Sequence, residues 1–426
     1  MKITYLTQAS LLIEFEGKKL LMDPWLVGSC WGGNIWHYPP PKIKPEEIKD
    51  IDFLYLSHAH DDHLHPESLA RLNSEVRAAK TLVPDFKAPY FEKALNANGL
   101  NNIYKMNNSE SISLTDNTSA VMFINDQGDH DSSLLIQSNG TNIFFQTDNI
   151  LSVEEAKRIG EKYDIDIVFT ITSLTGIFPG FFDFKSDDMY RLALEKKTSA
   201  LKYSFNIVKA LGASYAIPYA TDLCYLGQLY FANDIHGTNK NDYKKYVAEN
   251  GNPYEVSLMG PGDFISIKDQ LISFTLSEHD FAGKKLGGFA VEKRDEVYAT
   301  EKLERRYEND SYLEDISKIR SLLDSKTTYW KDEAFSVLWN IIGPKGERDS
   351  FYHRLPSNTS DYDCNESYEL RIEIPSYRLQ RLVRGDYKMG FLTLQNGSIR
   401  CHRHTENLTK IEKIFWNWAM LNLRFN

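Results

Sequence analysis

The chain has 426 residues, of which 42% are hydrophobic and 25% are charged, a balance typical of a globular protein with a sizeable core. Its 49 Lys and Arg residues and 59 Asp and Glu residues give a formal charge of −10, and the absence of a long basic run argues against a nucleic-acid-binding protein. The sequence has neither a long apolar segment nor a signal-peptide pattern at its start, so we expect no membrane association.

Short strands dominate the N-terminal part of the sequence. Apolar runs predict strands at 3–6, 10–15, 19–23 and 52–56, and a loop rich in Trp, Gly and Pro occupies 25–41. Further patterns predict strands at 120–125, 132–137, 142–146, 165–170 and 215–219, and helices at 153–162 and 187–211. Mixed strands followed by alternating strands and helices predict a two-layer β core covered by helices.

The character of the sequence changes after about residue 289. A highly charged, helix-favouring stretch is followed by a small α+β pattern, with strands expected at 387–394 and 398–403 and a helix near 408–421. We therefore expect two domains, 1–295 and 300–426. The second would cover one end of the first or mediate self-association, as in a homodimer.

The strongest motif is His58-x-His60-x-Asp62-His63, directly after a predicted strand. One turn could aim these side chains inward and serve two metal ions. Imidazoles and carboxylates suit zinc, iron or manganese, whereas a soft thiolate site would need cysteine. A polar surface loop is the alternative, and the position at a strand end favours the metal site. His65, just outside the motif, is better explained as a loop or capping residue.

Two later residues complete a possible ligand set. His130 precedes a predicted strand and could supply a third imidazole, and Asp148 follows another strand and could bridge two ions. Either residue alone would more often be an ordinary polar group, but their order after the motif favours ligands. Asp23 could orient a ligand histidine, or it could simply form a turn with Pro24.

The four cysteines are widely scattered and form no CxxC pair. This spacing argues against a zinc ribbon, a cysteine-ligated iron–sulfur cluster or a disulfide framework. Reduced thiols are typical of the cytoplasm, where we expect the protein to reside.

In their order along the chain, these residues resemble the metal-binding set of the metallo-β-lactamase superfamily, which implies an αββα sandwich with a small C-terminal α+β domain. The sequence also resembles the catalytic region of the CMP-N-acetylneuraminate hydroxylase family. That resemblance is carried by 22–41, 57–63, 178–180 with the helix after it, 238–242 and 382–418.

The sequence departs from these relatives in two ways. The hydroxylase family carries a Rieske iron–sulfur domain with paired Cys and His ligands, for which we find no motif, so electrons would come from a separate partner or from the substrate. In hydrolytic members, a strand ending in Pro-x-His gives an imidazole to the second metal, whereas this sequence has Ala220 after Pro218-Tyr219. His236 or Asp222 could replace that ligand, although His236 is better explained as an ordinary loop histidine.

Three functions fit this reading. In the first, two irons bridged by Asp148 activate dioxygen to hydroxylate a polar, possibly nucleotide-activated, small molecule. In the second, zinc, manganese or iron lowers the pKa of a bridging water that Asp62 orients, and a phosphodiester, lactone or thioester is hydrolysed. The third is a non-catalytic metal-binding scaffold. The missing strand-end histidine favours the first function, and the missing Rieske motif counts against it.

Candidate substrate contacts follow from the resemblance to an enzyme of nucleotide sugars. Lys185, Lys202, Lys240 and Asn241 could contact a phosphate or carboxylate, although such residues are usually solvent-exposed and only aid solubility. Trp25 could wall the pocket, and an aromatic side chain in such a loop is at least as often part of the core.

Overall fold

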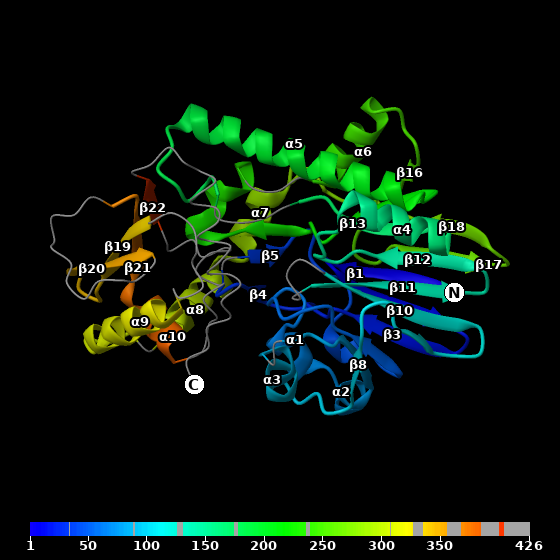
Figure 1. Ribbon diagram of the computed structural model, residues 1–426, viewed down its shortest axis with the longest axis horizontal. Coiled ribbons are helices and arrows are strands. Elements are labelled where there is room, and N and C mark those ends of the chain that lie inside the picture. Colours follow the sequence, from blue (N-terminus) through cyan, green and yellow to red (C-terminus); the bar gives the residue numbers. More distant parts are fainter. Residues whose placement is uncertain are drawn as a thin grey trace.

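The computed structural model describes residues 1–33, 35–87, 90–125, 131–173, 178–235, 239–306, 308–326, 335–355, 368–384 and 400–403. Within these ranges, two large sheets lie face to face, and helices cover both outer surfaces (Figure 1). None of the described helices is both long and apolar enough to cross a membrane.

The first large sheet has the strand order β18-β17-β1-β2-β3-β6-β7-β8. Its strands are β1 (Lys2–Thr7), β2 (Ser10–Phe15), β3 (Lys18–Met22), β6 (Phe53–Tyr55), β7 (Lys80–Pro84), β8 (Ile103–Met106), β17 (Phe264–Lys268) and β18 (Leu271–Thr275). Three helices pack on its outer face through an apolar cluster, namely α1 (Pro66–Arg71), α2 (Ser74–Ala78) and α3 (Tyr90–Ala97).

The second large sheet has the order β16-β14-β13-β12-β11-β10-β9. Its strands are β9 (Ser111–Ser113), β10 (Thr118–Ile124), β11 (Ser132–Ser138), β12 (Thr141–Phe145), β13 (Ile167–Ile171), β14 (Tyr215–Tyr219) and β16 (Glu255–Val256). Strands β12, β13, β14 and β16 are parallel, and β11 runs against them. The start of β11 and the ends of β12 to β14 therefore lie along one edge.

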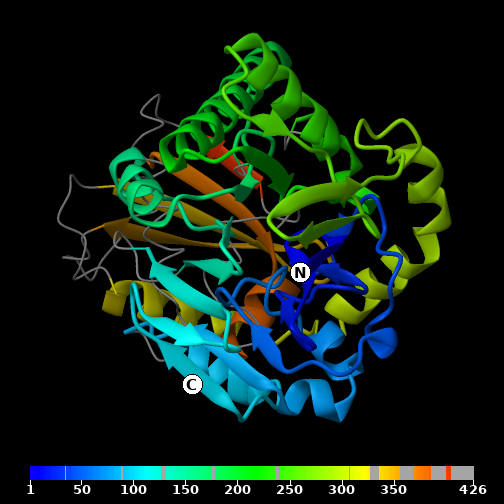
Figure 2. The same cartoon turned by 90° about the vertical axis from the view of Figure 1, so that its right-hand side faces the viewer.

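The outer face of the second sheet is covered by α4 (Val153–Tyr163), α5 (Ser186–Leu211) and α6 (Lys240–Glu249). Alternation along the strands divides their side chains between the two faces. Met122 and Leu134 lie in the core between the sheets, whereas their neighbours Val121 and Leu135 face the helices. Figure 2 shows α4 to α6 and α1 to α3 on opposite sides of the paired sheets.

Two smaller sheets lie at one end of the sandwich. One contains β4 (Ser29–Cys30), β5 (Ile35–His37) and β15 (Leu223–Tyr225), and the other contains β19 (Phe335–Ile342), β20 (Arg348–Leu355), β21 (Leu370–Pro375) and β22 (Arg400–Arg403). The remaining elements are α7 (Leu286–Glu292), α8 (Arg294–Glu304), α9 (Tyr312–Lys326), α10 (Ser376–Val383) and the 3-10 helices η1 (Pro45–Glu47) and η2 (Gly227–Asp234).

This architecture confirms the predicted αββα sandwich with a small C-terminal α+β unit. The expected loop at 25–41 is different, because it contains β4 and β5. Strand β5 pairs with β15, nearly 190 residues later, and β4 pairs in turn with β5, an arrangement that local sequence patterns cannot reveal. The strand expected at 387–394 and the helix near 408–421 lie outside the described residues, and β22 forms the end of the strand expected at 398–403.

Candidate metal centre

The His58–His63 motif lies on the turn that follows β6. The amides of His63 and Leu64 both donate to the carbonyl of His60, at 3.0 and 2.8 Å, which curls the chain back on itself. Immediately afterwards, His65 caps α1, because its Nδ1 accepts a hydrogen bond from the Ser68 amide. The tight turn brings three imidazoles of the motif close together.

A hydrogen bond across the two sheets places this turn against the start of β11. Ser132 Oγ donates to the carbonyl of Ser57 at 2.8 Å, and the Tyr55 hydroxyl lies 2.9 Å from the same Ser132 oxygen. Asp131, directly before β11, and Asp148, just after β12, therefore reach the motif from the edge of the second sheet.

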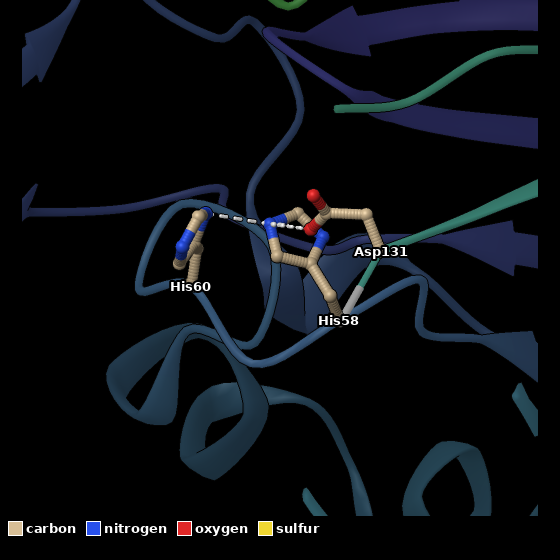
Figure 3. A group of neighbouring side chains, drawn as sticks. All are labelled: His58, His60 and Asp131. Carbon is tan, nitrogen blue, oxygen red and sulfur yellow. Dashed lines mark hydrogen bonds and ion pairs between the residues drawn. The ribbon is translucent and has the colours of Figure 1, made fainter. Parts of the chain in front are cut away.

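Two overlapping groups of side chains could each hold a metal ion, and both contain His58. One group adds His60 and Asp131, the other adds His63 and Asp148, and within each group the ligand atoms lie within 4.8 Å of one another. His58 Nε2 is 2.7 Å from His60 Nδ1 and 3.6 Å from an oxygen of Asp131 (Figure 3). The same nitrogen is 3.6 Å from an oxygen of Asp148. His63 Nε2 is 3.3 Å from Asp148 Oδ1.

Asp62 also borders this cluster, with Oδ2 3.8 Å from His63 Nε2. Its Oδ1 is buried and has no hydrogen-bond partner within the described part of the chain. Two expected ligands, His130 and His236, lie outside the described residues. Asp131 was missed by the sequence reading, although its place between His130 and a predicted strand could have signalled it.

Asp23 lies behind the imidazoles and is fully buried. Its Oδ2 is 2.8 Å from His63 Nδ1 and accepts a hydrogen bond from Ser57 Oγ at 2.6 Å, while Oδ1 accepts one from the Ser57 amide at 2.8 Å. Ser57 Oγ is also 2.9 Å from His58 Nδ1. Contacts at both Nδ1 atoms leave the Nε2 atoms of His58 and His63 facing the cluster.

The electrostatics of the cluster suit a cation. Burial alone would lower the pKa of His63, but Asp148, Asp23 and Asp62 outweigh burial and raise it well above its usual value. Burial alone would raise the pKa of Asp148, but the charge of His63 and a hydrogen bond with His60 bring it well below its usual value. Burial raises the pKa of Asp62, although His63 opposes that shift. The donor set of imidazoles and carboxylates, with Asp62 Oδ1 unpartnered among the described residues, fits a divalent ion.

The five expected substrate residues do not converge on this cluster as one group. Trp25 is completely buried in an apolar core, with its ring 3.7 Å from that of His37. Lys185, Lys202 and Asn241 are exposed on α5 and α6 or just before them.

The end of β14 holds no imidazole. Ala220 stands there with a left-handed φ of 56°, and its amide donates to the carbonyl of Gln8. Asp222, considered as an alternative metal ligand, instead pairs with the ammonium of the buried Lys240 at 2.8 Å and accepts a hydrogen bond from Tyr5. The side chains of Lys240 and Asp222 are 1% and 2% exposed, so this ion pair is buried.

Comparison with known proteins places this chain in a family. Residues 2–219, half of the chain, match the family model described as the beta-lactamase superfamily domain. The chain therefore belongs to this superfamily, whose metal-dependent members share the fold described above.

Two relatives resemble parts of the chain. A putative Rieske 2Fe-2S iron-sulfur protein of Mycolicibacterium smegmatis is 25% identical over 260 residues, which cover 57% of this chain and 48% of that protein. Cytidine monophosphate-N-acetylneuraminic acid hydroxylase of Cricetulus griseus is 33% identical over 92 residues, covering 21% of this chain and 16% of the hydroxylase. The matches thus span less than half the length of each relative.

Solved structures with a similar arrangement include both hydrolases and a hydroxylase. Isothiocyanate hydrolase from Delia radicum gut bacteria gives a TM-score of 0.47 at 13% identity, covering 63% of this chain and 99% of that one. CmlA, a diiron β-hydroxylase from Streptomyces venezuelae, gives a TM-score of 0.44 at 16% identity, covering 65% of this chain and 54% of that one.

Proposed function

We propose that this chain is a dinuclear metal enzyme that hydroxylates a polar small molecule, with two irons as cofactors and electrons from a separate donor. The main support is the composition of the two ligand groups, since each contains two imidazoles and one carboxylate. Non-haem iron oxygenases use this set, which leaves coordination positions open. Both groups use the same atom, Nε2 of His58. Two ions bound together would therefore need further ligands, for which we propose Asp62 and His130.

The named relatives also support an oxidative reaction. One is described as a Rieske 2Fe-2S iron–sulfur protein and the other as a hydroxylase. Because the matches cover only parts of these proteins, the donor and the substrate remain part of the proposal. We also propose a cytoplasmic location, which the free buried thiols of Cys30 and Cys224 support.

Two bound irons would supply the activation of dioxygen. The protein's own contribution is to orient the ligands and control access. His58 and His63 have side-chain exposures of 1% and 0%, so one side of the centre is closed to water. His60 and Asp148, at 33% and 31%, mark the open side from which a substrate can approach.

Hydrolysis of a phosphodiester, lactone or thioester is the second candidate. The observation that favours it is the buried carboxylate of Asp62, whose Oδ1 lacks a hydrogen-bond partner within the described residues. Such an oxygen could accept a proton from an attacking water. Zinc or manganese would then replace iron as the cofactor.

The two candidates differ in their metal and in their need for oxygen. We expect protein purified without air to contain iron, and the chemically reduced protein to reoxidise rapidly in air, as followed by its absorption spectrum. His58→Ala/His60→Ala should lose most of the metal and this reaction, because both proposed groups lose ligands. His402→Ala, on β22, is the control and should keep both the bound metal and the rapid reoxidation in air. Zinc with oxygen-independent turnover would favour hydrolysis, and full metal content in the double variant would refute the site.

A further inference from the structure

A cavity of ≈460 Å³ opens at the edge of the second large sheet where β13 and β14 end. Its wall includes Ser173, just after β13, and Thr221, just after β14. These strands are parallel neighbours of β12, after which Asp148 follows, so all three residues lie along the same edge. Adjacent strands are about 4.8 Å apart, so the ends of β13 and β14 lie about 5 and 10 Å along the sheet from the end of β12 that precedes Asp148.

The inner wall of the cavity offers hydroxyl groups and a carboxylate. Ser173 Oγ and Thr221 Oγ1 are buried and have no hydrogen-bond partner in the described ranges. The Asp222 carboxylate also lines the cavity, and its contacts with Lys240 and Tyr5 both fall on Oδ2. Leaving buried hydroxyls unpaired is energetically unfavourable. This wall is therefore built to exchange hydrogen bonds with a polar ligand.

The positive charges at the cavity are already neutralised by the protein. Two lysines and two aspartates line the wall: Lys197, Lys240, Asp222 and Asp234. Lys240 pairs with Asp222 at 2.8 Å, and Lys197 pairs with Asp242 at 2.5 Å. A phosphate entering here would meet carboxylates, and both described lysines of the wall would have to leave a partner to bind it.

The partial positive charge at the N-terminus of α6 is also already satisfied by the protein. Asn239 and Asp242 form a capping box, in which the Asn239 side chain accepts from the Asp242 amide and the Asp242 carboxylate accepts from the Asn239 amide. The negative charge of Asp242 also offsets the helix dipole. This helix end is consequently poorly suited to bind an anion.

Aromatic side chains surround the mouth and the inner part of the cavity. Tyr190 and Tyr230 are 52% and 39% exposed at the wall, and Tyr38, Tyr225 and Phe281 also line it. Flat aromatic faces pack well against the C–H faces of ring compounds, whereas neighbouring polar atoms fix their orientation.

We propose that this cavity is the substrate pocket of the neighbouring metal centre, and that it takes an uncharged ring compound with several hydroxyl groups, such as a glycoside, rather than a phosphorylated one. The role as a substrate pocket rests on the proposed function, but binding itself does not need the metal. The proposal also departs from the nucleotide-activated substrate that the sequence resemblance implies.

Calorimetry with phenyl hexosides and their 6-phosphates tests the proposal on the full chain. We expect at least one neutral hexoside to bind, and its phosphate to bind at least tenfold more weakly because of the wall carboxylates. Thr221→Val removes one hydroxyl and Tyr190→Ala one ring face, and each should weaken hexoside binding about three- to tenfold. Thr300→Val and Tyr298→Ala, both on α8 and neither in the cavity wall, are matched controls that should bind as the unmodified chain does.

Three results would overturn the proposal: equal or tighter binding of the phosphates, no binding by any neutral hexoside, or insensitivity to both cavity variants. The His58→Ala/His60→Ala protein separates this proposal from the proposed function. Hexoside binding should persist in that variant, because the cavity wall contains neither histidine. If binding persists but the iron and oxygen tests fail, the pocket stands and the hydroxylase function falls. If the iron and oxygen tests succeed but no hexoside binds, the hydroxylase function stands and the pocket proposal falls.

Discussion

Asp23 is the residue on which the orientation of the ligand imidazoles depends most directly. It contacts His63 itself and reaches His58 through Ser57. We expect Asp23→Asn to keep the fold but to weaken metal binding about 10- to 100-fold, because an amide no longer holds the His63 Nδ1 proton as a carboxylate does. Competition with a chelator of known affinity measures this change.

A second aspartate provides the control for this variant. Asp166 accepts a hydrogen bond from the Asn142 amide at 2.7 Å, at the opposite end of β12 from Asp148. Asp166→Asn should therefore leave the metal affinity unchanged. Equal affinities in Asp23→Asn and the unmodified chain would show that Asp23 only supports the turn.

Ligand residues were most readily predicted from the sequence where they lie close together along the chain. His58, His60 and His63 could be grouped from the sequence because they occupy one short turn. Asp131 joins them only because β11 starts at the edge where β12 ends, which is a property of the sheet. Lys240 could not be recognised as buried from the sequence, because the carboxylate that holds it in the interior belongs to Asp222, 18 residues earlier.

At the scale of elements, the three-stranded sheet of β4, β5 and β15 carries a buried histidine. His37, on β5, donates from Nε2 to the carbonyl of Trp25 at 2.9 Å and is fully enclosed. Burial lowers its pKa from 6.5 to about 3, only partly offset by that hydrogen bond. The unfolded chain therefore binds a proton that the folded chain does not bind between these pH values.

This difference predicts a pH-dependent stability. The free energy of unfolding should fall by about 1.4 kcal/mol per pH unit from His37 alone as pH drops from 6.5 towards 3. His37→Gln should be less stable at pH 7 but should lose stability less steeply on acidification, as measured by urea unfolding at several pH values. His402→Gln, at a half-exposed site, should keep the steep slope. An unaltered slope in His37→Gln would contradict this assignment.

Elements were predictable from sequence where they are long or fully apolar. All five residues of β13 are buried, and the 26-residue α5 has a regular apolar pattern, so both were expected within two residues of their observed bounds. The two-residue β4 and three-residue β5 have no such signal. They exist because distant segments pair with each other and bury their side chains, so only the assembled fold defines them.

At the scale of the whole molecule, the two parts expected at 1–295 and 300–426 share an apolar core. Trp25, after β3, and Trp31, directly after β4, pack in the same cluster as Trp339 and Ile372 of the C-terminal sheet. The ring of Trp31 also lies 5.2 Å from that of His60. The C-terminal sheet thus supports a loop that contacts a proposed metal ligand, and we expect the described parts to unfold in one transition.

A buried ion-pair network at the same junction tests this coupling. Glu304, at the end of α8, binds Arg378 at 2.5 Å and also Arg381, both on α10, and Arg378 Nη2 donates to the carbonyl of Gly32. Glu304→Gln would leave buried arginine charge poorly compensated, so we expect a loss of about 3–5 kcal/mol in the free energy of unfolding.

Because Gly32 adjoins Trp31, the same variant should also weaken metal binding, although it touches none of the proposed ligands. Glu301→Gln, one turn earlier on α8 and more exposed, should change neither quantity appreciably. Denaturant unfolding followed by tryptophan fluorescence, together with chelator competition, measures both effects. A second, separate unfolding transition in Glu304→Gln with unchanged metal affinity would show instead that the C-terminal unit folds independently and that Trp31 is held by the metallo-β-lactamase sandwich alone.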